Sequence, residues 1–124
     1  MTDTLDAAKL TDRVASLVEA ARKAGADAAD AVAVRGRSTG VSVRLGKVEG
    51  TEASESDNVA LRVFVGKRVA SVSATATADA NILAERAVAM ARVSPEDPWQ
   101  GLADPALLAR ETRDLDLFDA TEVS

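Results

Sequence analysis

The stretch VALRVFVGKRVASVSAT (residues 59–75) carries the clearest strand pattern of the chain. Its first half alternates apolar residues with smaller or polar ones, and the apolar set is Val59, Leu61, Val63 and Val65. This period of two is typical of a strand with one buried face. Gly66-Lys67 follows as a two-residue connection, with glycine where a type II′ turn requires it. We therefore predict that residues 68–75 return antiparallel to 59–65.

Arg62 is placed by the same alternation on the opposite face of the strand, beside Ala60 and Phe64. One interpretation is that Arg62 pairs with a carboxylate of the sheet, such as Glu49, or lays its stem over apolar surface. The other is that it contacts a partner domain or a peptide. Arg68, which begins the returning strand, is a second candidate for such a contact.

Upstream of this hairpin the sequence predicts further strands joined by turns. Segments 30–35 and 41–45 alternate with the strand period, and GRSTG (36–40) breaks the run between them. The polar segment 48–56 is interpreted as a solvent-rich strand at a sheet edge. Asp57-Asn58 favours a turn, because both residues tolerate left-handed backbone. Strands joined by tight turns are mostly antiparallel, so we expect a mostly antiparallel four-stranded sheet.

A helix precedes these strands. Residues 3–24 repeat apolar side chains at spacings of three and four, namely Leu10, Val14, Leu17, Val18 and Ala21. Asp3 or Thr4 suits the N-cap of this helix. Gly25 is placed to end it in left-handed backbone.

A second helix is predicted over residues 79–93, with Asp79 or Thr77 as its cap. Its buried stripe is expected to comprise Leu83, Ala87, Met90 and Ala91. Ser94-Pro95 ends it, because the residue before a proline is displaced from helical backbone. Helices before and after the strands can cover one face of the sheet, which predicts a two-layer α+β domain over residues 1–94.

Residues 95–124 follow as a loop, a short helix and a tail. The loop PEDPWQGLADP (95–105) contains all three prolines and the only tryptophan, Trp99. Trp99 either plugs the loop onto its own domain or anchors an interface. Asp104-Pro105 suits the start of a short helix that we expect to run through Arg110. The tail then presents apolar side chains that need a partner surface: Leu115, Leu117 and Phe118.

The composition narrows the classes of function. The 124 residues carry a net charge of −5, so the chain repels phosphate and we expect no nucleic-acid partner. The absence of histidine excludes an HExxH zinc site, a Ser-His-Asp triad and a Cys-His dyad built from this chain alone. No apolar run approaches the roughly 20 residues of a membrane span. We therefore expect a soluble, cytoplasmic protein with no membrane partner.

Two groups of charged residues are candidate binding sites. The acidic run Glu49, Glu52, Glu55 and Asp57 is interpreted as a solvated strand face, because alternation points its members to both faces. Basic residues from separate segments can gather into a patch: Arg35, Arg37, Arg44 and Lys67-Arg68. GRSTG and VGKR lack the setting of phosphate-binding loops, and we expect hairpin turns at both. We expect no catalytic residue, no metal ligand and no cofactor in this chain.

The order of several motifs resembles the N-terminal domain of the TldD/PmbA family, on its PmbA (TldE) side. The stretches that carry the resemblance are GKVEGTEASESDNVALRVFVGKRVASVSAT (46–75) and ANILAERAVAMARVSPEDPWQGLAD (80–104). They combine a G-x-x-E strand, a strand with a central arginine, a G-x-R hairpin, a helix ending in A-x-A-R and a D-P-x-x-G-L loop. Their order and spacing carry the resemblance together, and no one motif carries it alone.

The resemblance implies a role inside a larger protein. Family members are longer two-domain proteins that form a TldD–TldE heterodimer or a related dimer and act as a zinc-dependent peptidase on flexible peptides. Older naming calls PmbA a modulator of DNA gyrase. The zinc-binding HExxxH motif lies in the C-terminal domain of the TldD-type partner, and PmbA-type chains lack it. Residues 95–124 are thus expected to lead toward a C-terminal domain absent from this chain.

We therefore expect a non-catalytic domain that pairs with a TldD-like subunit or with itself and shapes the access of peptides to zinc held elsewhere. Its candidate interface or peptide contacts are Arg62, Arg68, Trp99, Leu115 and Phe118. The alternative is a free-standing acidic α+β binding module with no peptidase role. The tail discriminates between them: packing of residues 111–124 on their own domain favours the module, and exposure favours a part of a larger protein.

Overall fold

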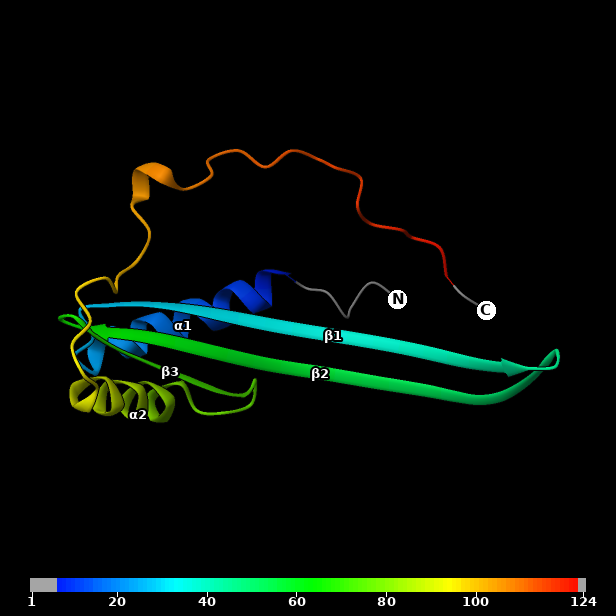
Figure 1. The fold of residues 1–124 in the computed structure, drawn as a ribbon, viewed down its shortest axis with the longest axis horizontal. Helices are drawn as coiled ribbons and strands as arrows, with labels where there is room; N and C mark the ends of the chain where they lie inside the picture. The colour runs from blue at the N-terminus through cyan, green and yellow to red at the C-terminus, as the bar shows by residue number, and fades with distance from the viewer. Residues whose placement is uncertain (1–6, 123–124) are drawn as a thin grey trace.

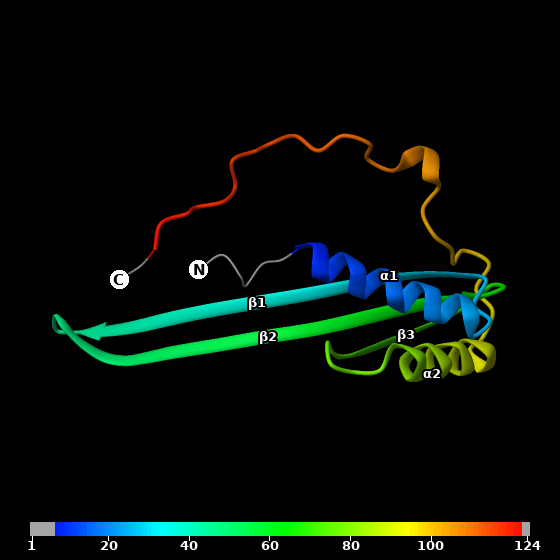
Figure 2. The ribbon, with the colours of Figure 1, turned by 180° about the vertical axis from the view of Figure 1, so that it is seen from behind.

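The computed structural model describes residues 7–122. Its elements are, in chain order, α1 (Ala7–Lys23), β1 (Ala28–Arg44), β2 (Lys47–Val65), β3 (Arg68–Thr75), α2 (Ala80–Val93) and the 3₁₀ helix η1 (Pro105–Leu107). The strands form one antiparallel sheet in the order β1-β2-β3 (Figure 1). Both helices lie at the same end of this sheet and pack on one of its faces, here called the inner face (Figures 1 and 2). The predicted two-layer α+β class is confirmed.

The predicted number of strands is wrong, because the described residues form three strands and not four. The segment GRSTG at 36–40 continues β1, and Asp57-Asn58 continues β2. Gly36 pairs with Ser56 and Gly40 pairs with Glu52 in an unbroken register. Neither glycine has a positive φ, so neither bends the chain. Pairing along the whole ribbon therefore overrides the turn preference of these residues.

Two tight turns connect the strands. Gly66, with φ of +59°, and Lys67 join β2 to β3, which confirms the predicted hairpin. Leu45 and Gly46 join β1 to β2, and both have positive φ, as in a type I′ turn. A β-bulge lies just before this second turn, at Ser42/Val43.

The core lies between the inner face and the two helices. Its best-buried members come from α1, β2 and α2: Leu17, Ala21, Val59, Leu61, Val63, Leu83, Ala84, Ala87, Val88 and Ala91. The predicted buried face of residues 59–63 is therefore confirmed. Met90 lies at the margin of the α2 stripe and is 43% exposed, so its predicted burial is wrong. In α1 the predicted positions Leu10, Val14 and Val18 are half-buried.

The ends of the helices follow the predicted signals. Gly25 ends α1 with φ of +105°, a left-handed backbone that glycine adopts without strain. Asp79, and not Thr77, caps α2, and its carboxylate accepts two backbone N–H groups of the first turn. The predicted cap of α1 at residues 3–4 lies outside the described residues.

Residues 35–57 of β1 and β2 project beyond β3 and the helices as a two-stranded arm (Figures 1 and 2). Strand β3 pairs only with residues 58–65 of β2, so the arm has two strands along its whole length. Almost all of its side chains are exposed. Because two-stranded ribbons are marginally stable in water, the arm is a part of the fold that gains from contact with another molecule.

Residues 94–100 carry the chain from the end of α2 past the β2–β3 turn. The Asp97 N–H donates to the Lys67 carbonyl at 2.8 Å, and Arg68 donates to the Ser94 carbonyl. These bonds hold the first part of the loop against the sheet. No helix within residues 7–122 is long and apolar enough to cross a membrane.

The helix predicted through Arg110 is wrong beyond its first turn. Asp104 caps η1 as predicted and accepts the Ala106 N–H at 2.9 Å, but η1 ends at Leu107. An isolated helix this short is unstable without a packing partner, and here none of its residues is buried. The tail, residues 108–122, is extended and exposed (Figure 1).

Candidate functional site

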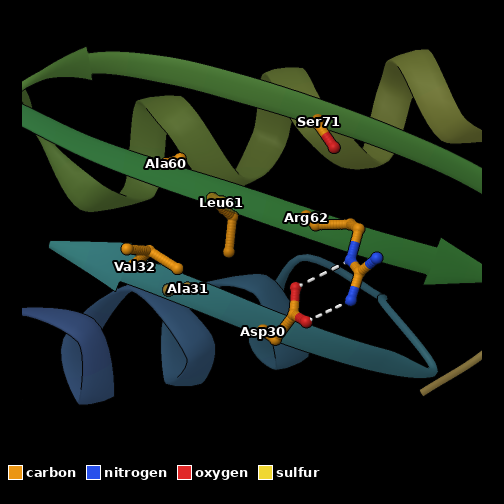
Figure 3. A pocket seen from close by; sticks show the side chains of 7 residues that line it. All are labelled: Asp30, Ala31, Val32, Ala60, Leu61, Arg62 and Ser71. Carbon is orange, nitrogen blue, oxygen red and sulfur yellow. Dashed lines mark hydrogen bonds and ion pairs between the residues drawn. The ribbon is translucent and has the colours of Figure 1, made fainter. Parts of the chain in front are cut away.

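The face of the sheet opposite the helices, here called the outer face, carries Arg62 (Figure 3). Arg62 lies directly across from Asp30 in the β1–β2 register. Its Nε donates to Asp30 Oδ1 at 2.9 Å, and its Nη2 donates to Oδ2. This two-point geometry fixes the plane of the guanidinium. It raises the pKa of Arg62 above its ordinary value through the hydrogen bond to Asp30.

The Arg62 guanidinium also lies over the ring of Phe64, 5.2 Å from its centre. Phe64 is 3% exposed, so the outer face is covered at this end of the sheet. The interpretation that Arg62 pairs with a sheet carboxylate is confirmed, but the expected partner is wrong. Glu49 instead pairs with Arg44, at 3.3 Å, at the far end of the arm.

A shallow hollow of about 230 Å³ lies beside this ion pair (Figure 3). Backbone and side chains of three strands line it: Asp30, Ala31, Val32, Ala60, Leu61, Arg62 and Ser71. Val32, at its apolar side, is 57% exposed. The hollow therefore offers apolar walls and a satisfied ion pair at its rim. This suits an apolar side chain of another segment, because the charged groups already bond each other.

The remaining predicted contact residues do not gather into one site. Arg68 lies near the start of the loop, with its Nη2 3.8 Å from Glu96 Oε1. Trp99 is 93% exposed, so the interpretation that it plugs its own domain is wrong. Leu115 and Phe118 are exposed in the tail. These side chains are available for contact at separate places.

Within the arm, the arginines lie on β1 and the carboxylates that they contact lie on β2. Three arginines of β1 each pair with a carboxylate of β2: Arg35 with Asp57, Arg37 with Glu55, and Arg44 with Glu49. The arginines thus form no free basic patch. The acidic run is exposed, as predicted for a solvated face, apart from the half-buried Asp57. Among residues 7–122, no three His, Cys, Asp or Glu residues gather closely enough to hold a metal ion.

Sequence reasoning missed two apolar features. Val32 and Val34 are more than half exposed on the outer face, whereas the smaller Ala31 and Ala33 pack against the core. The hairpin register holds the signal, because Ala31 pairs with the buried Leu61 and must share its face. Leu45, at the apex of the arm, is 95% exposed.

Residues 29–91 match a family model described as PmbA/TldA metallopeptidase domain 1. The chain belongs to the PmbA/TldD family. The match to this family takes in almost all of the three strands and of α2, and therefore both the outer face and the arm. The resemblance drawn from the motifs is thus confirmed.

Two PmbA-type relatives extend the comparison. A metalloprotease PmbA homolog of Haemophilus influenzae is 34% identical over 118 residues, which is 93% of this chain and 26% of the relative. The metalloprotease PmbA of Escherichia coli O157:H7 is 37% identical over 92 residues, which is 71% of this chain and 20% of the relative. The chain spans about a quarter or less of the length of these relatives.

Proposed function

We propose that this chain acts as a non-catalytic N-terminal domain of a PmbA-type subunit in a zinc-dependent peptidase, where it serves dimer formation and the access of peptides. One observation carries the proposal: a domain of a metallopeptidase family is present in a chain without histidine. Catalytic zinc in proteases is held mainly by histidine, together with carboxylates. The residues described here offer no metal cluster. The zinc chemistry is therefore assigned to residues outside this chain, in a TldD-like partner.

The strand edges support a role in peptide access. Within residues 7–122, strand β1 pairs with β2 alone, and residues 47–57 of β2 pair with β1 alone. Each therefore has one edge without a neighbouring strand, and no proline interrupts either edge. An extended peptide can add to such an edge through its backbone, largely independently of its sequence. This suits a peptidase that accepts flexible peptides.

The exposed apolar side chains support contact with another subunit. Trp99, Leu117 and Phe118 are each at least three-quarters exposed. The described part of the tail does not pack on its own domain. Such exposure favours a part of a larger assembly over a free-standing acidic module.

The test uses the purified 124-residue chain. We expect no stoichiometric zinc by mass spectrometry and no hydrolysis of an unstructured peptide, with or without added zinc. We also expect the chain to co-elute with a TldD-type subunit in size-exclusion chromatography. Turnover by this chain alone, abolished by a chelator, contradicts the non-catalytic role. Failure to bind either a TldD-type subunit or a second copy contradicts the role in dimer formation.

A further inference from the structure

Leu45 occupies the apex of the arm in a left-handed conformation that the two-residue turn requires but that a leucine side chain does not favour. Its φ of +51° is left-handed backbone, which costs a leucine free energy that asparagine or glycine does not incur. Its side chain is 95% exposed, so it gains nothing from its own core. A strained, exposed apolar residue at a fixed apex is a feature expected of a contact with another molecule.

The outer face has a matching receptor at the other end of the arm. The hollow of about 230 Å³ has apolar walls formed by the side chains of Val32 and Ala60 (Figure 3), whereas the side chain of Leu61 is buried in the core beneath it. Its charged members, Asp30 and Arg62, are bonded to each other. No side chain of a described residue fills the hollow, which is large enough for the four carbons of a leucine side chain.

The apex and the hollow lie at equal distances from the middle of the arm, on either side of it. Leu45 and Ala31, which lines the hollow, lie equally far along β1 from Ser38, about 23 Å at a strand rise of about 3.3 Å per residue. Ser38 faces Ser54 across the ribbon, and their hydroxyls are 2.7 Å apart. A two-fold axis parallel to the sheet, above this serine pair, therefore brings each Leu45 over the hollow of a second copy.

The charges of the arm favour contact through the outer face. The ion pairs Arg35–Asp57 and Arg37–Glu55 alternate onto the inner face, on the side of Ala31 and Ala33. From Val34 to Gly40 and across on β2, the outer face carries one charged side chain, Glu52, and the same alternation places Arg44 on this face beside the apex, where it pairs with Glu49. A second copy thus meets little charge that it must remove from water.

The size of the surface suits a weak dimer. From hollow to apex the outer face runs about 45 Å by about 10 Å over two strands. Two such faces bury roughly 1,000 Å², which is near the lower limit for a specific interface. Val34 then lies against Ser42 of the other arm, which allows close packing, whereas Val32 lies over the aliphatic stem of Arg44.

We propose that two copies of this chain pack outer face against outer face with antiparallel arms, and that each Leu45 enters the hollow of the other copy. The inference rests on the proposed function and deepens it, since it names the surface that would form the dimer. The strand edges stay free for peptides in this arrangement.

The first test replaces Leu45 with asparagine. Asn-Gly is the favoured pair for a type I′ turn, so Leu45→Asn should raise the melting temperature of the dilute monomer. The same change should raise the dimer dissociation constant at least about tenfold in sedimentation equilibrium, because two buried leucines are lost. The matched control is Leu117→Asn, at a tail position that is 85% exposed, which should leave the dissociation constant unchanged.

The second test uses the absence of cysteine from the sequence. A cysteine at Ser38, beside the proposed axis, should give a covalent dimer with a short bis-maleimide linker. A cysteine at Thr39, which points to the other face of the arm, should give several-fold less.

Three results overturn the inference: a wild-type chain that stays monomeric, a Leu45→Asn dimer as tight as the wild type, or equal cross-linking from both cysteines. A monomeric chain that still lacks zinc and turnover and still binds a TldD-type subunit refutes this interface alone. Turnover by the isolated chain refutes the proposed function, whatever its oligomeric state.

Discussion

Gly25, at the end of α1, lies against Arg92, near the end of α2: a Cβ added to Gly25 would be 2.8 Å from Arg92 Nη2. The backbone of Gly25 is also left-handed, with φ of +105°. We therefore expect Gly25→Ala to lower the free energy of unfolding by at least about 1 kcal/mol. Urea denaturation followed by circular dichroism measures this loss.

Gly40→Ala is the matched control for Gly25→Ala. Gly40 lacks a positive φ, and an added Cβ there meets nothing within 4 Å. Its replacement should leave the stability unchanged or slightly raised. Because Arg92 is flexible at its far end, Gly25→Ala should stay destabilising when Arg92 is also changed to alanine. A full rescue by the second change would assign the cost to the clash and not to the backbone.

The cross-strand pair of Asp30 and Arg62 should contribute little to stability. Both side chains are more than 40% exposed, so solvent screens their attraction. A double-mutant cycle with Asp30→Ala and Arg62→Ala should give a coupling energy of about 0.2–1 kcal/mol that falls with added salt. Lysine at position 62 should not reproduce the coupling energy with Asp30, because lysine lacks the two-point geometry of the guanidinium. A coupling well above this range would contradict the solvated character of the pair.

The two turns show what the sequence specifies locally and what it does not. Gly66-Lys67 was predictable, because a glycine stands between two strand patterns at the position that needs positive φ. Leu45-Gly46 adopts a related turn with leucine in left-handed backbone, which no local preference favours. Pairing over the long ribbon on either side fixes that turn. Only the structure therefore reveals the continuous arm and its exposed apex.

The register of β1 with β2 decides which side chains of β1 face the core, and the composition does not indicate that register. Val32 and Val34 are larger and more apolar than Ala31 and Ala33, so hydrophobicity alone places the valines inside. The register with β2 places Ala31 beside the buried Leu61 instead, and the close approach of α1 leaves room only for small residues. The fold class was predictable from periodicity, whereas the hollow of the outer face depends on this long-range choice.

The caps at Asp79 and Asp104 should differ in their effect on stability. Asp79 caps α2, whose residues form part of the core. Asp79→Ala should therefore lower the free energy of unfolding by about 1 kcal/mol. Asp104→Ala, at the short and exposed η1, should change it by less than about 0.5 kcal/mol. Equal losses in chemical denaturation would mean that η1 packs on the domain in solution.

Glu19 and Arg22 provide a test of charge pairing by pH. The hydrogen bond from Arg22 lowers the pKa of Glu19 below its ordinary value. A lowered folded-state pKa contributes stability above the unfolded-state pKa, and this contribution is lost as the pH falls through the folded-state value. Arg22→Gln should therefore raise the pKa of Glu19 in an NMR titration. The free energy of unfolding should then fall less steeply as the pH is lowered. An unchanged pKa would show that the pair does not persist in solution.

Trp99 offers a direct optical test of the loop. It is the only tryptophan of the chain and is 93% exposed, so its emission should resemble that of tryptophan in water. Acrylamide should quench it nearly as efficiently in the folded chain as in urea. A blue-shifted, protected emission in the dilute monomer would mean that Trp99 packs on its own domain. If a TldD-type subunit covers the loop, the blue shift should appear only on mixing. It should persist in Leu45→Asn, because Leu45 lies in the β1–β2 turn and the loop is bonded to the β2–β3 turn, at the other end of β2.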